Sequence, residues 1–592
     1  MYYILEQAEL RGLCSPLSGV RPYTRNVVIG KINEILNSEN TKRLGATERE
    51  ILNNYLGTFS RPKTGINWQR GAFFSETAMG SKNIPLSMGI GVTADIEGST
   101  GIYLQDGNQY GMELWLGLWL NGDLGHNLSY EFIFEGGLMR IPRNFLGKYN
   151  TYYEGFPYDD ETDSAYAYRI IDVYSEPLTH FPYTYKKRWE YSIVHFSSLT
   201  YMDTWPQDLA ASYNLPTELA ASFLENKLTM RLGRISREWS STAFGSSLAY
   251  NQMARPFLAL EAEFNPVSWL GLASLTGFLE FYNRVGLKET AMTFQNAFSI
   301  GMLQLRYKNY LFFDIVDAVV WPKRLELGYI APIINNYFYQ NNAGDFDNMA
   351  VTLNLKAQYP GLGNLWFSFF VDEMDITVSD FSKLDREMIA VQAGMNLSLP
   401  FLSFSSLKIS YTKINPYCYT HPRIFSPWYG DLRMETAYVN NGACLGYYLP
   451  PNSDELLVMY KTMPAKNVSA YLQYQLIRHG ADFGPSAVDG SNLLSELYYP
   501  AIGSGQVELY RFFLRDGAYQ WNHIIKVSAE WNLPGLPVSL FGEAGAVISY
   551  FTNIAEPANS KGEPSAYSRI NTSDYPESTG FIVKIGLRVF GR

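Results

Sequence analysis

Apolar and polar side chains alternate over long parts of the chain from about Trp68 onward. A period of two places the apolar residues on one face of a β-strand and the polar residues on the other. Such strands fit a soluble sandwich, or a membrane barrel whose polar face lines a wet lumen and whose apolar face meets lipid. The clearest alternating stretches are Met112–Leu120, Leu128–Phe134, Val351–Tyr359, Ile525–Leu533 and Thr579–Arg592.

The lengths of the connections favour the barrel. Short, proline-containing connections are Asn265–Trp269, Tyr359–Asn364, Leu399–Ser403 and Leu533–Pro537, and long polar ones are Pro142–Lys187, Ile414–Tyr438, His479–Gln506 and Thr552–Ser578. Alternating short and long connections are typical of a bacterial outer-membrane barrel, with short turns in the periplasm and long loops outside. The roughly 520 residues after the N-terminal region would make roughly 16–20 strands of about 10 residues.

The closing stretch Thr579–Arg592 is predicted to be the last strand of this barrel. It is about as long as a membrane-crossing strand, which needs roughly 9–11 residues. Its alternation predicts that Lys584 and Arg588 face the lumen. The residues predicted to face lipid are Phe581, Val583, Ile585, Leu587 and Val589.

The N-terminal region, residues 1–60, has helical periodicity instead. Tyr2–Arg11 and Thr24–Leu36 are predicted helices, and a third begins at Thr47, which would form a capping box with Glu50. Three short amphipathic helices predict a small bundle on the periplasmic side. We therefore expect two domains, a helical bundle over 1–60 and a barrel over 61–592.

Two further segments connect these elements. Ser60–Asn67 reads as the linker that leaves the bundle, because proline and glycine interrupt it. Thr217–Glu225 has a helix-like composition, and we expect a short helix there before the strand at Lys227–Gly233. No internal repeat and no charge block accompany them.

Composition narrows the class of protein. The 592 residues include 15% aromatic and only 18% charged residues, which suits aromatic girdles around an outer-membrane barrel. No run approaches 18 consecutive apolar residues, so transmembrane helices are not expected. The net charge of −10, without a cluster of Lys and Arg, argues against a nucleic-acid partner.

Cysteine and motif chemistry add little. Cys14, Cys418 and Cys444 are too few for a disulfide scaffold or a cysteine metal site, although pairing of Cys418 with Cys444 stays open. GxSxG, HExxH and P-loop motifs are absent and the histidines are scattered, so we predict no catalysis, no metal and no cofactor. A barrel enzyme that assembles its site from separate strands is the remaining alternative.

Aromatic residues cluster with acids in the long connections and are candidates for polysaccharide binding. Aromatic faces stack on sugar rings, and carboxylates bind hydroxyls or a hard cation such as Ca²⁺. A solvated loop whose aromatics pack on one another is the alternative. The candidates are Tyr152, Tyr153, Phe156, Tyr158, Tyr166, Tyr168, Trp428 and Tyr429.

Charged residues also fall on the predicted lumen face. They would set ion selectivity in an open lumen, or form ion-pair networks that brace or plug it. Both signs occur in similar numbers, so no ion preference follows. These residues are Glu261, Glu263, Arg306, Lys356, Lys408, Lys526 and Glu530.

Several stretches, in order along the chain, carry a family resemblance. They are YILEQAELRGLCSPLSGVRPYTR (Tyr3–Arg25), the stretch Asn226–Phe257, the pair Asp347-Asn348 with a hairpin ending at Val371–Glu373, and YTKINPYCYTH (Tyr411–His421) followed by GACLGYYLPPNSDELLV (Gly442–Val458). Together they resemble the Wzi-type capsule-assembly family of outer-membrane proteins.

The resemblance implies an 18-stranded barrel with a periplasmic helical bundle. It implies a non-catalytic role in anchoring or organising surface polysaccharide, either capsular or exopolysaccharide, with outer-membrane lipid as the other partner. We expect a monomer in a bacterial outer membrane. A diffusion channel for small solutes is the alternative function, and it differs in having an open lumen.

Overall fold

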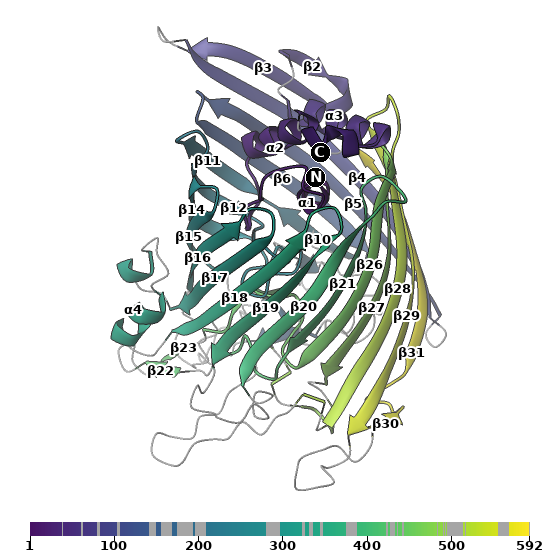
Figure 1. Cartoon of the computed structure of the whole chain (residues 1–592). Helices are drawn as coiled ribbons and strands as arrows, with labels where there is room; N and C mark the ends of the chain where they lie inside the picture. Colours follow the sequence, from purple (N-terminus) through teal and green to yellow (C-terminus); the bar gives the residue numbers. More distant parts are fainter. Residues whose placement is uncertain are drawn as a thin grey trace, which may run out of the picture.

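A computed structural model shows a closed antiparallel barrel with short helices at one end (Figure 1). The structure describes the chain except residues 38, 61–62, 80–82, 104–106, 141–149, 156–167, 174–192, 196–208, 280–295, 323–325, 331–335, 344–346, 374–386, 422–423, 427–431, 435, 441–442, 482–483, 489, 492, 494–512, 515–516, 555–566 and 591–592.

Eighteen antiparallel strands of the described chain close the barrel, which confirms the predicted fold class. They are β4 (Ile84–Tyr103), β5 (Gly107–Leu124), β6 (Leu128–Arg140), β10 (Leu209–Asn214) continued by β11 (Thr217–Phe223), β12 (Leu228–Ile235), β14 (Phe257–Val267), β15 (Leu270–Phe278), β16 (Ala297–Tyr307), β17 (Leu311–Trp321), β18 (Asn348–Tyr359), β19 (Gly363–Glu373), β20 (Met388–Leu399), β21 (Ser405–Ile414), β26 (Ser453–Ala465), β27 (Val468–Gly480), β28 (Gly517–Asn532), β29 (Val538–Ile554) and β31 (Ser578–Val589). The last strand, β31, pairs with β29 and with β4 and so closes the wall.

The prediction of a helix at Thr217–Glu225 is wrong. Thr217–Phe223 is strand β11, which pairs with β6 on one side and β12 on the other. The local helix propensity of this segment is overridden, because hydrogen bonding to a neighbouring strand on each side stabilises it as a strand. β10 pairs with the other half of β6, so β10 and β11 occupy a single place in the barrel, interrupted at Leu215-Pro216.

The two ends of the barrel differ as predicted. The four short connections each join neighbouring strands, for example β14 to β15 and β28 to β29. The four long connections lie between β6 and β10, β21 and β26, β27 and β28, and β29 and β31. We call these two ends of the barrel the turn end and the loop end.

The outer face of the wall is apolar, as the alternation predicts. In β31, Phe581, Val583 and Ile585 are exposed on the outside, whereas Lys584 is buried and lies 3.8 Å from Glu543. An apolar side chain on an outer wall gains nothing in water but matches a hydrocarbon solvent. In the described part of the chain, no helix has the length and apolar character needed to cross a membrane.

The predicted N-terminal helices form at the turn end, where both chain termini also lie (Figure 1). They are α1 (Tyr2–Leu10), α2 (Arg25–Asn37) and α3 (Ala46–Phe59), with the 3₁₀ helix η1 (Glu39–Arg43) between the last two. Their shared apolar core includes Phe404 and Met463 of the barrel, so the bundle packs on the wall. Its assignment to a separate periplasmic domain stays a prediction.

The capping box predicted for Thr47 and Glu50 is wrong. Helix α3 begins one residue earlier, at Ala46, and the carboxylate of Glu48 accepts a hydrogen bond from the Gly45 N–H at 3.0 Å. Glu50 instead forms an exposed ion pair with Lys466, at 2.6 Å. Glu48 and Glu50 lie in the same helical turn, so the sequence allows a capping box with either acid. The structure uses Glu48.

Short elements accompany the barrel. At the turn end, β2 (Gly65–Asn67), η2 (Trp68–Arg70) and β3 (Ala72–Met79) extend the wall beside β4. At the loop end, β9 (Ile193–His195) pairs with β10, and β30 (Tyr567–Ile570) pairs with β29. The remaining two-stranded sheets are β1 (Val20–Arg21) with β13 (Glu238–Trp239), β7 (Asn150–Gly155) with β8 (Tyr168–Val173), β22 (Ile424–Ser426) with β23 (Leu432–Met434), and β24 (Val439–Asn440) with β25 (Ala443–Cys444).

Candidate functional site

The inner face of the wall is polar, yet its side chains are buried. On β17 and β18, Asp314, Asn354 and Lys356 point into the barrel and are almost inaccessible to solvent. A wet lumen would leave such groups exposed. They are covered because two segments fill this part of the interior, one from the N-terminus and one from the connection between β12 and β14.

The connection between β12 and β14, residues 236–256, folds into the barrel, and we call it the lumen loop. Its strand β13 pairs with β1 of the N-terminal segment, with Val20 opposite Trp239 and Arg21 opposite Glu238. The Ser240 N–H donates to the Gly19 carbonyl at 2.9 Å. A Cβ at Gly19 would lie 2.9 Å from the backbone of Ser240 and Ser241, so the close approach of the two segments requires glycine.

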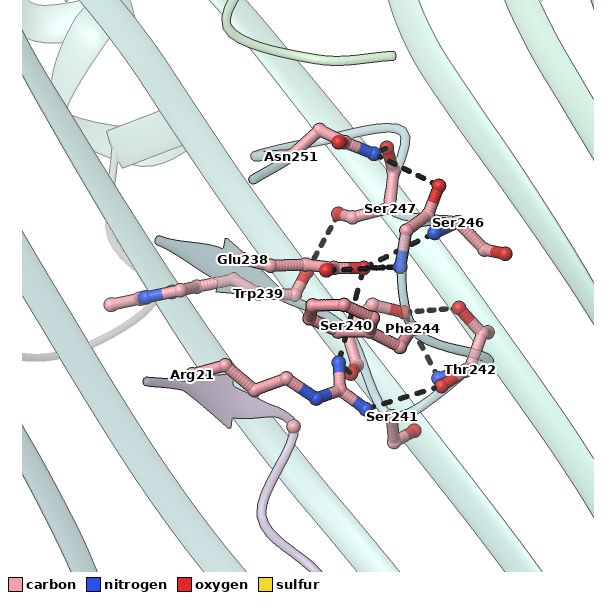
Figure 2. A network of polar contacts seen from close by, with 12 residues as sticks. Arg21, Glu238, Trp239, Ser240, Ser241, Thr242, Phe244, Ser246, Ser247 and Asn251 are labelled. Atoms are coloured by element: carbon pink, nitrogen blue, oxygen red, sulfur yellow. Dashed lines mark hydrogen bonds and ion pairs between the residues drawn. The ribbon is translucent and has the colours of Figure 1, made fainter. Parts of the chain in front are cut away.

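Arg21 joins the two segments by charge (Figure 2). Its guanidinium donates to the Ser240 carbonyl at 3.0 Å and to Glu6 of α1 at 3.3 Å, and it lies 3.9 Å from Glu238. The pKa of Arg21 is raised because nearby Tyr23, Glu238 and Glu6 outweigh the opposing effect of burial. Burial raises the pKa of Glu6, although Arg21 opposes that shift.

Glu238 organises the lumen loop itself. It is fully buried, and its carboxylate accepts hydrogen bonds from the N–H groups of Gly245, at 2.8 Å, and Ser246, at 3.1 Å. Further along the loop, Ser247 Oγ donates to the Trp239 carbonyl at 2.8 Å (Figure 2). A buried carboxylate that accepts backbone donors fixes the fold of a loop that lacks regular pairing.

The barrel wall holds the lumen loop from its inner face. Asp314 of β17 accepts hydrogen bonds from both the N–H and the hydroxyl of Ser241, at 2.8 and 2.7 Å. Lys408 of β21 donates to the Phe244 carbonyl at 3.0 Å and to Ser246 Oγ at 2.8 Å. The loop is therefore bound by strands from different parts of the wall.

Three buried charges anchor the start of the loop. Glu261 of β14 lies between Arg231 of β12, at 2.8 Å, and Arg237 of the lumen loop, at 2.7 Å. Both arginines and the glutamate are almost fully buried. Each charge in such a group depends on its partners, because water cannot replace them.

An aromatic layer covers the lumen loop on the side of the loop end. Tyr250 packs edge-on against Phe298, and Phe298 packs edge-on against Tyr438, with ring centroids 5.5 Å apart in both pairs. Tyr438 in turn stacks on Tyr419, and the ring centroids of Tyr419 and Phe370 are 4.7 Å apart. Tyr438 and Tyr419 also donate hydrogen bonds to the lumen-loop carbonyls of Ala249 and Leu248.

This aromatic layer belongs to one continuous buried apolar cluster. The cluster includes inward-facing residues from strands all around the barrel, among them Trp115, Ile524, Val547 and Ile582. The cluster joins the lumen loop and the aromatic layer to inward-facing residues of these strands, so parts of the chain itself occupy the interior at this level. Cys418 and Cys444 lie in the same cluster as free thiols, and burial raises the pKa of both.

The predicted lumen charges each have a partner in the structure. Glu263 accepts from Asn265, Lys356 pairs with Glu9 of α1 at 3.0 Å, and Glu530 lies 3.5 Å from Arg588. Arg306 donates to Gln304, and Lys526 lies over the Tyr471 ring. Glu261 and Lys408 hold the lumen loop as described. Their role in ion selectivity stays a prediction.

Few of the predicted polysaccharide-binding residues can be placed. Tyr152 and Tyr153 are in β7 and Tyr168 is in β8, so the three belong to a single two-stranded ribbon apart from the barrel sheet. The other candidates, Phe156, Tyr158, Tyr166, Trp428 and Tyr429, lie outside the described residues.

The residues that fill the lumen were not predicted. Arg21, Glu6 and Glu238 are separated by up to 232 positions along the chain (238 − 6 = 232). One signal was available, because Ala243–Ala254 contains no charged residue although it lies between two strands. No group of His, Cys, Asp and Glu in the described chain is arranged to hold a metal ion.

These features define a class of protein, a membrane-spanning β-barrel whose lumen is filled by its own chain. The fold is similar to that of Wzi from Escherichia coli, an outer-membrane protein involved in group 1 capsule assembly and a carbohydrate-binding β-barrel. That similarity covers 99% of this chain and 96% of Wzi, with a TM-score of 0.52 and 8% identity.

Two porin structures are less similar. OccAB2 of Acinetobacter baumannii matches 84% of this chain and 97% of its own, with a TM-score of 0.39 and 8% identity. OprD of Pseudomonas aeruginosa matches 89% and 99%, with a TM-score of 0.36 and 9% identity. No protein-family model and no curated protein matches the chain. The closed barrel, its apolar outer face and its similarity in fold to Wzi support the predicted place in a bacterial outer membrane.

Proposed function

We propose that this protein is a non-catalytic outer-membrane barrel that anchors or organises surface polysaccharide at its loop end. The observation that carries the proposal is the filled lumen, in which the lumen loop, β1 and the aromatic layer occupy the interior. A diffusion channel needs a continuous water path, whereas here the lumen loop lies inside the barrel and bonds to the aromatic layer above it. The barrel then serves as a support for what lies outside it.

Two further points support a glycan as the partner. The barrel with the most similar fold named above, Wzi, binds carbohydrate. The long connections at the loop end are rich in aromatic residues, whose faces stack on sugar rings. A repeating polysaccharide would be held by many weak contacts, which together retain a chain that no single contact could hold. On this proposal the β7–β8 ribbon, with Tyr152, Tyr153 and Tyr168, is one contact surface.

The role is tested by deleting the gene in its native host and measuring cell-attached and shed polysaccharide. We expect the cell-attached fraction to fall while total synthesis stays constant, because retention and not polymerisation depends on the barrel. Complementation with the intact gene should restore attachment. Unchanged attachment after deletion would contradict the proposal.

The contact surface is tested on purified protein with the host's own polysaccharide immobilised. The double variant Tyr152→Ala, Tyr153→Ala should weaken capture several-fold, because stacking surfaces are lost. Tyr359→Ala is the matched control, since Tyr359 is an exposed tyrosine at the opposite, turn end. Equal capture by all three proteins would remove this ribbon from the site. Loss of capture in the control as well would point to general damage.

A further inference from the structure

The connection between β17 and β18 lies against the outside of the barrel (Figure 1). Its described elements are the 3₁₀ helix η7 (Leu327–Ile330) and helix α4 (Asn336–Ala343). On β17, Asp314 binds the lumen loop and therefore faces inward, so Asp317, Val319 and Trp321 face outward. All three outward-facing residues are nevertheless buried, because η7 and α4 cover them.

The cover is attached by specific contacts. Asp317 accepts a hydrogen bond from the N–H of Asn336, the first residue of α4, at 2.9 Å. Trp321 packs on Tyr329 of η7 with ring centroids 5.7 Å apart, and Tyr329 donates to Asp347. A carboxylate on the outer wall thus meets the positive end of a helix instead of lipid. The cover is a built part of the fold.

The height of this cover follows from strand length. Strands β14, β16 and β17 have 11 residues each. A strand crosses the hydrocarbon with roughly 9–11 residues, so the loop ends of these strands coincide with its outer boundary. Val319 and Trp321 are at that end of β17. The cover therefore lies at the level of the outer leaflet.

The exposed residues that the structure describes on this cover are apolar. Leu327 is 71% exposed and Phe338 is 67% exposed, and Ile330 is also exposed. None of residues 327–343 is charged, in a chain with 18% charged residues. The wall on either side also exposes apolar residues, with Leu258 and Phe278 on β14 and β15 and Leu353 on β18.

We propose that η7 and α4 form an interfacial anchor, which inserts Leu327, Ile330 and Phe338 among the acyl chains of the outer leaflet. An amphipathic element with one face docked and the other apolar gains stability from burial in the acyl region. The anchor thickens the barrel on one side and fixes its height in the membrane there. This inference rests on the membrane barrel and is independent of the polysaccharide role.

The test is site-directed spin labelling of the full chain in vesicles of phosphatidylethanolamine and phosphatidylglycerol. Phe338→Cys and Leu327→Cys can be labelled selectively, because the three native cysteines are buried. Leu355→Cys, on the outer face of β18, is the control for lipid, and Glu50→Cys, exposed on α3, is the control for water. A difference in electrophoretic mobility between unheated and heated samples, as folded outer-membrane barrels show, confirms that each variant has folded.

Collision rates with oxygen, which partitions into lipid, and with a water-soluble nickel chelate give the result. We expect the ratio of oxygen to nickel collisions at positions 338 and 327 to be several-fold above that at position 50 and close to that at position 355. A ratio equal to that at position 50 would place the anchor in water and overturn the proposal. Low collision rates with both reagents would overturn it too, because a protein partner or a second copy would then cover the surface.

Discussion

Two layers fill the barrel, and they are held by different forces. Around Arg21, Glu238 and Glu6, the N-terminal segment and the lumen loop are joined by buried charges and hydrogen bonds. Nearer the loop end, Tyr250, Phe298 and their neighbours form an apolar and aromatic layer. The comparison separates a layer held mainly by buried charges from a layer held mainly by the packing of rings. It also predicts that the polar layer is the more sensitive to a single substitution.

The largest effect is expected at the charge group that anchors the lumen loop. Glu261→Gln should lower the free energy of unfolding by about 3–5 kcal/mol, because it leaves Arg237 buried without its carboxylate and leaves Arg231 with Glu218 alone. Urea unfolding in lipid vesicles, followed by tryptophan fluorescence, gives the value. Glu50→Gln is the matched control, because it makes the same chemical change at an exposed carboxylate. A loss below about 1 kcal/mol for Glu261→Gln would show that water enters this region.

A smaller effect is expected at the contact between the two segments. Arg21→Met should cost about 2–3 kcal/mol, because Glu6 and Glu238 lose their cation but keep the backbone donors of Phe244, Gly245 and Ser246. The same urea measurement applies. Protease accessibility of the N-terminal segment should rise in parallel, and a variant as stable and as resistant as the original would contradict the assignment of Arg21 as the link.

The aromatic layer should respond less to the loss of a single polar atom. Tyr438→Phe removes only the hydroxyl that donates to the Ala249 carbonyl and leaves the ring in place. We expect a loss of about 1–2 kcal/mol in the free energy of unfolding, because one buried acceptor is left unpaired. A cost equal to that of Arg21→Met would mean that the two layers do not differ in the way described.

The smallest effect is expected on the surface of the bundle. Lys466→Ala breaks the exposed ion pair with Glu50 and should change the free energy of unfolding by less than about 0.5 kcal/mol. The midpoint of urea unfolding should therefore be nearly unchanged. A large shift would show that the ion pair at the β26–β27 turn fastens the bundle to the barrel. We expect the buried core shared with Phe404 and Met463 to hold the bundle instead.

The wall of the barrel was predictable and its filling was not. The alternation in Thr579–Arg592 and the lengths of the connections are local properties, so they predicted the strands, the two ends and the lipid face. Thr217–Phe223 was assigned to a helix because its pairing with β6 and β12 is invisible locally. The contact of Arg21 with the lumen loop joins residues more than 200 positions apart, and no periodic pattern encodes it. The aromatic residues of the long connections were identified from composition alone. Composition shows where aromatic side chains occur in the sequence, but not what they contact.

Single-channel recording in planar bilayers tests the filled lumen most directly. The intact protein should give no stable conductance steps, because in the described part of the chain the polar and aromatic layers occupy the interior of the barrel. Replacing residues 238–254 by a short glycine-serine linker removes the lumen loop from both layers and should produce steps under the same conditions. Stable, reproducible steps from the intact protein would contradict the account and restore the diffusion channel as its function.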